Sequence, residues 1–481
     1  MDTLIKSLVQ AKLDPERIIP RAIMARYTTF HIGGPADVLV NIAAANEIPL
    51  ALRAAKQAGV PVTLIGNGSN VLVRDGGIRG LVIRIDGSMA AIRQEGDTLH
   101  VQSGALIRAA ANFAMNEGLS GLEEVAGIPG TIGGGVIMNA GAYGIRVGTM
   151  TPGPLDRITD VPGVTVGHAT IRDEKHNTGV TVIMPCQDNM FSSKLVAASF
   201  VLNGFGKTQG LIQVDELGTL ETPIALTNTL NVGVVHDALV SYMAKRCEAD
   251  GIAMRSLNPV VGECNDAGLS TIVDRPVTAE HVFAAIESAD VLFEEGGVGA
   301  GAGTICHGLK GGIGSSSRII EVGEERFTLG ILVQSNYGGL AELTIGGRPV
   351  GQEILKARAQ EAEKQAMDRG SIMMIAATDM PVSDRQLRRI LKRCGAGLAR
   401  LGSYYGHGSG DVMIGFSTAN RIPHGHRGEV LSMRMVTEET LESAFRAAAE
   451  ATEEAVLNSL CAAEDTKGPT GRVVEAIGKY V

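Results

Sequence analysis

The chain has 481 residues, enough for about three domains of ordinary size. Its 62 glycines and 17 prolines fall well below the roughly 25–30% that marks a low-complexity disordered chain, so most of it is expected to fold. The net charge of −9 at pH 7 gives no general attraction to phosphate backbones and argues against a nucleic-acid partner.

The first residues predict neither a targeting segment nor a membrane span. Residues 1–17 lack the basic start, apolar middle and small-residue cleavage site of a secretory signal. The uncharged stretch 125–145 is long enough to span a bilayer, but Pro129 and seven glycines interrupt it. The six cysteines contain no C-x-x-C pair and are expected to be reduced, buried thiols rather than disulfides or zinc ligands. We therefore expect a cytoplasmic protein with no membrane contact and no metal.

Short β-rich runs alternate with helical stretches over the N-terminal part of the chain. The predicted strands are residues 62–65 and 81–85, and the predicted helices are residues 43–57 and 107–116. This pattern indicates an α/β or α+β domain.

A cluster of glycine and proline at residues 148–154 separates two well-patterned regions. We place a domain boundary near Pro152, which predicts one domain over residues 1–150 and a second over residues 151–481.

The second region also reads as α/β. Its predicted strands are residues 179–184, 329–334 and 372–376, and they alternate with amphipathic helices. Leu441, Phe445, Ala448 and Val456 recur at helical spacing among glutamates. This spacing predicts a helix with a core-facing apolar stripe and a solvated acidic face.

Two glycine-rich segments stand out in the first domain. They are residues 66–75 (GNGSNVLVRD), which directly follow a predicted strand, and residues 127–135 (GIPGTIGGG). Such turns can point successive backbone N–H groups at an anion, because glycine tolerates positive φ and has no Cβ to block a phosphate. A pyrophosphate fits this description, and the alternative is a pair of tight turns.

Four motifs occur in the order found in UDP-N-acetylenolpyruvoylglucosamine reductases. They are YTTFHIGGPAD at 27–37, the 66–75 segment, SGA at 103–105, and GLEEVAGIPG at 121–130 continuing to NAGAYG at 139–144. Residues 20–145 resemble the flavin-binding half of that family, which implies FAD with its diphosphate near residues 66–70. The implied cofactor contacts are Gly66, Asn67, Gly68, Ser69, Asn70, Gly127, Ile128, Gly130 and Gly134.

The other half of that family carries substrate binding and a Tyr-Arg-x-Ser element whose serine donates a proton. No tyrosine of this chain is followed by arginine, and nothing after residue 144 resembles that half. The N-terminal domain is therefore expected to be a truncated remnant that binds flavin without reductase activity.

The second domain lacks the common hydrolase templates. It contains neither a G-x-S-x-G elbow nor an H-E-x-x-H zinc helix. The run 296–303 approaches a dinucleotide fingerprint, but Glu294 and Glu295 would repel a pyrophosphate, and a mobile glycine turn is expected instead.

A more informative feature is the junction between Gly370 and Ser371. A charged run predicted as helical, residues 356–369, ends at Gly370, and Ser371 then opens an apolar strand. If the bond between them is cut, Ser371 carries both a hydroxyl nucleophile and a free amine that can serve as its base. On this feature alone the alternative is an ordinary turn.

Further motifs surround that junction in order. They are ITDVPGVTVGH at 158–168, NGFGK at 203–207, ETPIALTNTLNVG at 221–233, CHGLKGGIG at 306–314, VQSNYG at 333–338 and GS at 370–371. Together they resemble the L-aminopeptidase/D-esterase and β-peptidyl aminopeptidase family.

That resemblance implies an αββα sandwich similar to N-terminal nucleophile hydrolases, cleaved at Gly370–Ser371 into an α part and a β part that stay associated. It implies Ser371 as nucleophile, Ser409 and Asp411 as the pair that orients and charge-balances it, and Asn336 as side-chain donor to the oxyanion. Small peptides, amides or esters are the implied substrates, a homo-oligomer (a tetramer in the family) the implied assembly, and the hydrolase needs no cofactor.

Two positions depart from the family pattern. β-Peptidase members often have glutamate where this chain has Asp411, and Gly268 replaces a residue that is often aromatic near the substrate. Both changes bear on substrate preference.

Three functions compete on this evidence. The leading one is a self-processing serine aminopeptidase. The second is an FAD-dependent UDP-N-acetylenolpyruvoylglucosamine reductase of peptidoglycan synthesis. The third is a fusion in which a flavin-binding or passive N-terminal part accompanies an active hydrolase.

Overall fold

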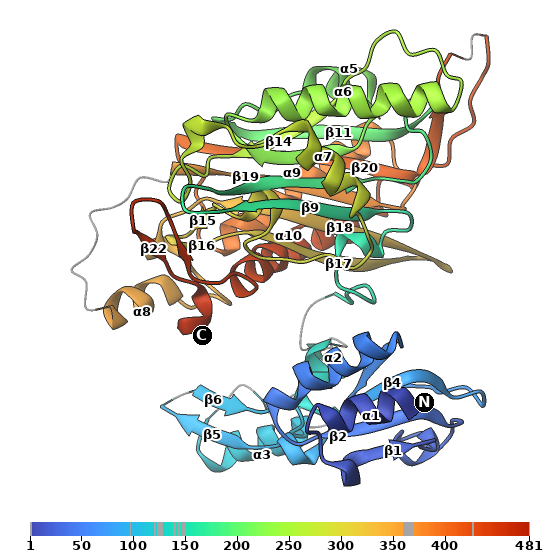
Figure 1. The fold of residues 1–481 in the computed structure, drawn as a ribbon, viewed down its shortest axis with the longest axis vertical. Helices are drawn as coiled ribbons and strands as arrows, with labels where there is room; N and C mark the ends of the chain where they lie inside the picture. The colour runs from blue at the N-terminus through green and yellow to red at the C-terminus, as the bar shows by residue number, and fades with distance from the viewer. Residues whose placement is uncertain are drawn as a thin grey trace. The chain divides into compact units, whose positions relative to one another are not determined.

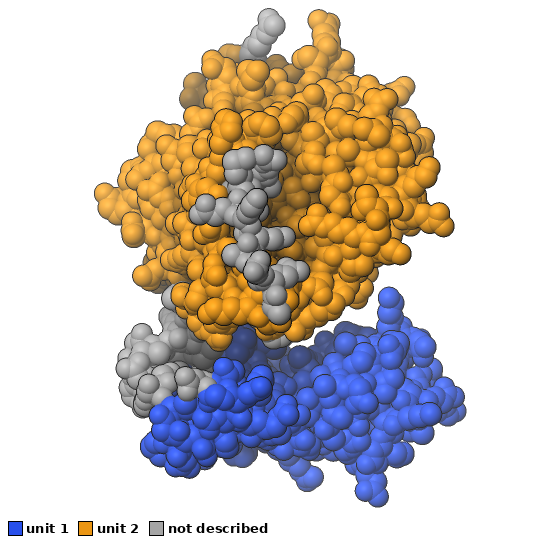
Figure 2. All heavy atoms as spheres, turned by 90° about the vertical axis from the view of Figure 1, so that its left-hand side faces the viewer, with its two compact units in different colours: residues 1–151 blue, residues 152–481 orange. Residues whose placement is uncertain are grey.

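The chain forms two compact units, Met1–Thr151 and Pro152–Val481 (Figures 1 and 2). The computed structural model describes residues 2–96, 98–119, 122, 128–137, 141–142, 145–146, 150–358, 369–425 and 428–480. Each unit has its own hydrophobic core.

The first unit is built on a four-stranded sheet in the order β1-β2-β4-β3. The strands are β1 (Ile18–Pro20), β2 (Ala36–Ile42), β3 (Val62–Ile65) and β4 (Ile78–Ile85). Strand β4 pairs in parallel with both β2 and β3, whereas β1 pairs antiparallel to β2. Parallel strands require crossover connections, and α2 lies in the connection from β2 to β3, the two strands that flank β4.

The helices and hairpins of this unit surround the sheet. They are α1 (Asp2–Gln10), α2 (Ile48–Ala58), α3 (Ile107–Asn116), α4 (Ile132–Ile137), and the strand pairs β5 (Ile92–Glu95) with β6 (Thr98–Val101) and β7 (Gly141–Ala142) with β8 (Ile145–Arg146). Helix α3 has the predicted bounds. Helix α2 begins later than residue 43, because Pro49 suits the first turn of a helix and lacks the N–H that an interior position needs.

The second unit contains a six-stranded sheet in the order β12-β11-β20-β19-β18-β17. Its strands are β11 (Ser193–Gly204), β12 (Thr219–Leu220), β17 (Ile313–Val322), β18 (Glu325–Asn336), β19 (Arg369–Thr378) and β20 (Gly408–Pro423). The central pair β19 and β20 is parallel, and the other pairs are antiparallel.

A second sheet of four strands faces it, in the order β14-β13-β10-β9. These strands are β9 (Thr165–Arg172), β10 (Asn177–Met184), β13 (Ile224–Asn228) and β14 (Val260–Cys264). Every residue of β10 is buried, as expected for a strand covered on both faces. Val182 and Leu226 of this sheet share one core with Leu332, Ile375 and Ile414 of the six-stranded sheet.

Helices cover the outer face of each sheet. α6 (Val232–Ala249) and α7 (Ala279–Glu287) pack on the four-stranded sheet, and α9 (Asp384–Arg400) and α10 (Leu441–Cys461) pack on the six-stranded sheet (Figure 1). The shorter elements are α5 (Leu211–Leu217), α8 (Val350–Ala357), and the two-stranded pairs β15 (Ile305–Cys306) with β16 (Leu309–Lys310) and β21 (Thr466–Lys467) with β22 (Val473–Val474). The expected αββα sandwich is confirmed.

Helix α10 corrects one expectation. Leu441, Ala448 and Val456 are buried as predicted, but the acidic face is not wholly solvated, because Glu450 is only 6% exposed. Its carboxylate lies 3.7 Å from the guanidinium of Arg318 on β17. Contact with both the sheet and α9 buries more of this helix than a single apolar stripe would cover.

Within the described residues, no helix combines the length and apolarity needed to cross a membrane. The six cysteines are free thiols, and five of them are buried, as the sequence predicts.

Candidate active site

The predicted nucleophile lies in the middle of the six-stranded sheet. Ser371 is the third residue of β19, so the strand begins before the Gly370–Ser371 bond rather than at it. In the antiparallel pairing with β18, Ser371 is opposite Asn336. In the parallel pairing with β20, Gly370 is matched with Ser409 and the residue after Ser371 with Asp411. Register alone therefore brings together the four residues expected to carry the chemistry.

Ser409 and Asp411 form a buried pair beside the nucleophile. Both side chains are fully buried, and the Ser409 hydroxyl donates a hydrogen bond of 2.8 Å to Oδ1 of Asp411. Asn203 on the neighbouring strand β11 donates to the backbone oxygens of Ser409, at 2.6 Å, and of Gly406, at 2.8 Å. These bonds hold the start of β20 in place, so the carboxylate is positioned before any substrate binds.

The side chain of Asn336 is held in one orientation. Its Oδ1 accepts a hydrogen bond of 2.9 Å from the backbone N–H of Ile305. Because that bond uses the oxygen, the Nδ2 group is the end of the amide left to act as donor. A fixed N–H donor is what stabilisation of an oxyanion requires.

Gly370 lies against the backbone of Asn336. A β-carbon at position 370 would lie 2.0 Å from the carbonyl oxygen of Asn336. Only glycine fits there without moving β18 or β19. The bond before Ser371 therefore lies in a segment packed closely on the backbone of Asn336.

A cavity of about 960 Å³ opens onto these residues. Its lining residues are Phe205, Lys207, Thr229, Glu263, Asn265, Gly268, Ile305, Gly308, Asn336, Gly338, Gly370, Ser371, Tyr404, Gly406, His407, Gly408 and Arg472. Ser371, only 4% exposed, and Asn336 reach the cavity, whereas Ser409 and Asp411 lie behind its wall.

Sequence reasoning missed Glu263. This carboxylate is the penultimate residue of the apolar strand β14, is 4% exposed and lines the same cavity as Ser371. Its Oε1 accepts a hydrogen bond of 2.9 Å from the backbone N–H of Lys207, and its Oε2 accepts one from the hydroxyl of Thr229. A charged residue inside an apolar run was the available signal, since a buried carboxylate normally has a specific partner.

Cys264 lies beneath the nucleophile and does not compete with it. Its thiol donates to the backbone oxygens of Ser371, at 3.5 Å, and Gln334, at 3.4 Å. Complete burial raises the pKa of Cys264 well above its ordinary value. The thiol therefore stays protonated and is a poor nucleophile.

Lys310 organises the loop that orients Asn336. Its fully buried ammonium donates to the carbonyl oxygens of Gly301 at 2.9 Å, Thr304 at 3.1 Å and Gly311 at 2.6 Å. Burial lowers the pKa of Lys310 to about 7. The glycine run predicted as a mobile turn is instead buried at 299–301 and fastened by this lysine.

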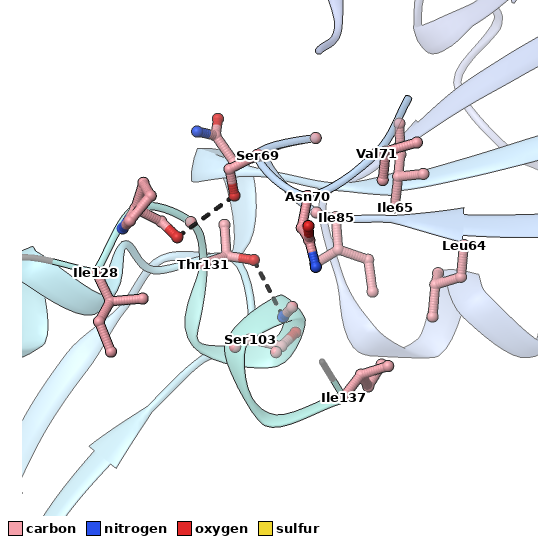
Figure 3. A pocket seen from close by; sticks show the side chains of 18 of the residues that line it. Leu64, Ile65, Ser69, Asn70, Val71, Ile85, Ser103, Ile128, Thr131 and Ile137 are labelled. Carbon is pink, nitrogen blue, oxygen red and sulfur yellow. Dashed lines mark hydrogen bonds between the residues drawn. The ribbon is translucent and has the colours of Figure 1, made fainter. Parts of the chain in front are cut away.

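The predicted flavin contacts of the first unit line a separate cavity of about 500 Å³ (Figure 3). Eight of the nine lie on its wall: Gly66, Asn67, Gly68, Ser69, Asn70, Ile128, Gly130 and Gly134. Gly127 lies outside the described residues.

Two hydrogen bonds hold the glycine segments around this cavity. The Ser69 hydroxyl donates to the carbonyl oxygen of Pro129 at 3.4 Å, and the N–H of Gly134 donates to the Thr131 hydroxyl at 3.3 Å (Figure 3). The wall also carries a set of apolar side chains, which are Leu64, Ile65, Val71, Ile85, Ile128 and Ile137. The cavity thus combines backbone polarity on one part of its wall with apolar surface on another.

The second unit has two facing sheets covered by a pair of helices on each side, and a serine directly after a glycine on a central strand. These are features of N-terminal-nucleophile-type hydrolases, and the second unit is of that class. The chain belongs to peptidase family S58, whose model matches residues 156–474. A β-peptidyl aminopeptidase of Sphingosinicella xenopeptidilytica is 38% identical over 347 residues, covering 68% of this chain and 86% of that protein.

A solved structure shows the same fold. The L-aminopeptidase D-Ala-esterase/amidase of Ochrobactrum anthropi, described as a variant of the Ntn hydrolase fold, matches with a TM-score of 0.64 and 36% identity. The match covers 69% of this chain and 93% of that one. The expected resemblance of the second unit is confirmed.

The first unit matches different proteins. The model of an FAD binding domain matches residues 36–154. A UDP-N-acetylenolpyruvoylglucosamine reductase of Rubrobacter xylanophilus is 50% identical over 133 residues, which are 27% of this chain and 45% of that enzyme. The chain therefore spans less than half of the reductase that it resembles.

Proposed function

We propose that this protein is a self-processing serine aminopeptidase that acts on small peptides, amides or esters. The observation that carries the proposal is the register that places Ser371 between Asn336 and the Ser409–Asp411 pair at the edge of one cavity.

Self-processing uses the same groups as catalysis. The Ser371 hydroxyl attacks the carbonyl carbon of Gly370, the C–N bond breaks, and an ester to the serine oxygen forms as the nitrogen takes up a proton. Water then hydrolyses the ester, leaving a carboxylate on Gly370 and a free amine and hydroxyl on Ser371. Gly370 packs closely on the backbone of Asn336, which supports a role for that residue in processing as well as in turnover.

In turnover the freed α-amine of Ser371 accepts the proton from its own hydroxyl as the oxygen attacks the substrate carbonyl. Asn336 donates to the oxyanion, and the amine returns the proton to the leaving group. Water hydrolyses the resulting acyl-enzyme. While the amine is protonated, the negative charge of Asp411 offsets its positive charge. The Ser409 hydroxyl holds that carboxylate in place by donating a hydrogen bond to it.

Glu263 is suited to bind the amino group of the substrate. An aminopeptidase must recognise an ammonium, and Glu263 is the acidic residue among those that line the cavity. Its two protein partners are neutral donors, a backbone N–H and a hydroxyl, so its negative charge is not neutralised by them.

Replacing Glu263 by glutamine is expected to lower kcat/KM for an unblocked aminoacyl p-nitroanilide by at least about 30-fold, because one partner of a desolvated charge pair is lost. The matched control is Glu287→Gln, an exposed glutamate of α7, which should behave as wild type. Release of p-nitroaniline by purified, processed protein measures the effect. Unchanged hydrolysis by Glu263→Gln would remove the ammonium role, and no hydrolysis by wild type of any α-, β- or D-aminoacyl substrate would remove the proposed function.

We further propose that the first unit binds FAD weakly and reduces no enolpyruvyl sugar. The backbone N–H groups of residues 67–70 donate to no acceptor among the described residues, and they would serve the cofactor's diphosphate. The apolar wall at Leu64, Ile85 and Ile137 would contact the ring system. Bound FAD would supply hydride transfer, but the Tyr-Arg-x-Ser proton donor is missing.

Protein purified with FAD present is expected to lose most of its flavin absorbance on desalting and to oxidise no NADPH when the enolpyruvyl sugar nucleotide is added. We expect weak binding because the first unit covers only a small area of the flavin ring system, and burial of apolar surface provides much of a cofactor's affinity. Free FAD in the same buffer, passed over the same column, is the control for carry-over. Stoichiometric retained flavin together with substrate-dependent NADPH oxidation would make the reductase the better function.

An exposed apolar segment and the free thiols bear on assembly and location. The segment after β20 extends away from the sheets and exposes Val430, Leu431, Met433 and Met435 (Figure 1). Apolar side chains gathered on one segment favour contact with a second copy, in keeping with the expected homo-oligomer. Six free thiols favour a reducing compartment such as the cytoplasm.

A further inference from the structure

A hairpin near the C-terminus contributes one wall of the catalytic cavity. Strands β21 and β22 are joined by a turn in which Gly468 donates to the carbonyl of Arg472 at 2.8 Å and Gly471 donates to that of Gly468 at 3.0 Å. Arg472 lies at the end of this turn and is exposed, and it lines the cavity that contains Ser371.

The hairpin is anchored on both sides. Asn177 of β10 donates to the carbonyl of Lys467 at 3.1 Å, and the backbone N–H of Lys310 donates to the carbonyl of Glu475 at 2.8 Å. The side chain of Glu475 pairs with Arg358 at 2.8 Å. The backbone of Arg472 therefore has a defined place beside the cavity, although its side chain reaches into solvent.

The neighbouring wall is backbone rather than side chain. Gly268, which departs from the often aromatic residue of the family, lines the cavity with Arg472. A β-carbon at position 468 would contact Leu269 at 3.2 Å, so the hairpin packs directly on this loop. Arg472 is therefore the charged residue beside Gly268, where the cavity wall has no side chain.

The cavity is lined by more basic than acidic residues. Glu263 is its acidic lining residue, while Lys207 and Arg472 are its cations. The ammonium of Lys207 lies 4.8 Å from the centroid of the Phe205 ring. Among the described residues, the guanidinium of Arg472 has neither a hydrogen bond nor an ion pair. A guanidinium without a protein partner beside a catalytic cavity is available to a ligand anion.

We propose that Arg472 binds the C-terminal carboxylate of the substrate and so selects very short peptides, foremost dipeptides, over amidated or longer ones. The inference rests on the proposed aminopeptidase function. Arginine presents a planar pair of N–H donors that matches a carboxylate bidentately. A dipeptide carries an ammonium for Glu263 at one end and a carboxylate for Arg472 at the other, and the cavity is within the range of small-molecule sites.

Lys207 is less suited to this task. Its backbone N–H is bonded to Glu263, so it belongs to the segment that holds the proposed ammonium site. Arg472 comes instead from the hairpin packed on residues 268–269. Opposite charges held by different segments can engage the two ends of one substrate.

The test compares substrates that differ only at the C-terminus, using the processed full-length protein. The probes are alanyl-alanine and β-alanyl-alanine, each with its C-terminal amide, and the product alanine or alaninamide is quantified. Wild type is expected to favour the free acid by about 10-fold in kcat/KM, mainly through KM. Arg472→Gln is expected to abolish that preference while leaving hydrolysis of the amide unchanged.

Two further variants sharpen the result. Arg472→Lys should restore part of the preference, because charge is retained and the bidentate geometry is lost. Arg255→Gln, a change at another exposed arginine, should match wild type. A preference that survives in Arg472→Gln, or a wild type that favours the amide or cleaves the amide alone, would overturn the inference. Hydrolysis of the amide tests the aminopeptidase function separately, since it does not require Arg472.

Discussion

Replacing Ser371 by alanine is expected to leave one uncut chain without peptidase activity, whereas the wild type separates into residues 1–370 and 371–481 on a denaturing gel. The hydroxyl is needed twice, first to attack the carbonyl of Gly370 and then to attack the substrate. Asn336 and the Ser409–Asp411 pair remain in place in the variant, but they have no nucleophile to assist. Loss of activity should therefore reach the background of the assay.

The matched variant is Ser371→Cys, which keeps a nucleophile of similar size. It should still be cut, because a thiol can carry out the same acyl shift. Intact mass of the fragments identifies the cut bond. A wild type that stays as a single full-length chain with undiminished activity, or a cut at another bond, would show that Ser371 is not the nucleophile.

Asn336→Ala should lower kcat by about 10²–10³-fold, the usual effect of removing one oxyanion donor. KM should change little, since the lost hydrogen bond is strongest in the transition state. Processing at Gly370–Ser371 should slow as well, because attack on the carbonyl of Gly370 also forms an oxyanion and the proposal assigns the same donor to both reactions. Steady-state kinetics and the rate at which the two fragments appear measure both effects.

A second substitution separates the donor role from a structural one. Asn336→Asp keeps an oxygen that can accept from the N–H of Ile305, but it replaces the Nδ2 donor by negative charge. It should therefore be at least as inactive as the alanine variant while keeping the loop bond. Asn265→Ala removes another asparagine side chain from the same cavity and should stay near wild type. Full activity in Asn336→Asp would exclude the oxyanion role.

Much of the framework could be predicted from local sequence. The bounds of α3 and the strands that contain residues 179–184, 329–334 and 372–376 follow from apolar runs with clear stops. These features depend on short-range geometry, which the order of residues determines by itself. Gly370 and Ser371 are different, because alone they are typical of an ordinary turn, and their expected roles came from the motifs that surround them in the sequence.

The charged groups around the site depend on contacts between distant segments. Glu263 and Arg472 line one cavity although they come from β14 and from the turn before β22. Glu450 of α10 is buried by the packing of that helix on the sheet and on α9, and its partner there is Arg318 of β17. Lys310 is buried because three carbonyls of the surrounding turns accept from it. The order of residues by itself determined the strands, and with the surrounding motifs it predicted the nucleophile, while only the tertiary structure decided which charges surround them, since burying a charge requires partners that neighbouring residues in the chain do not supply.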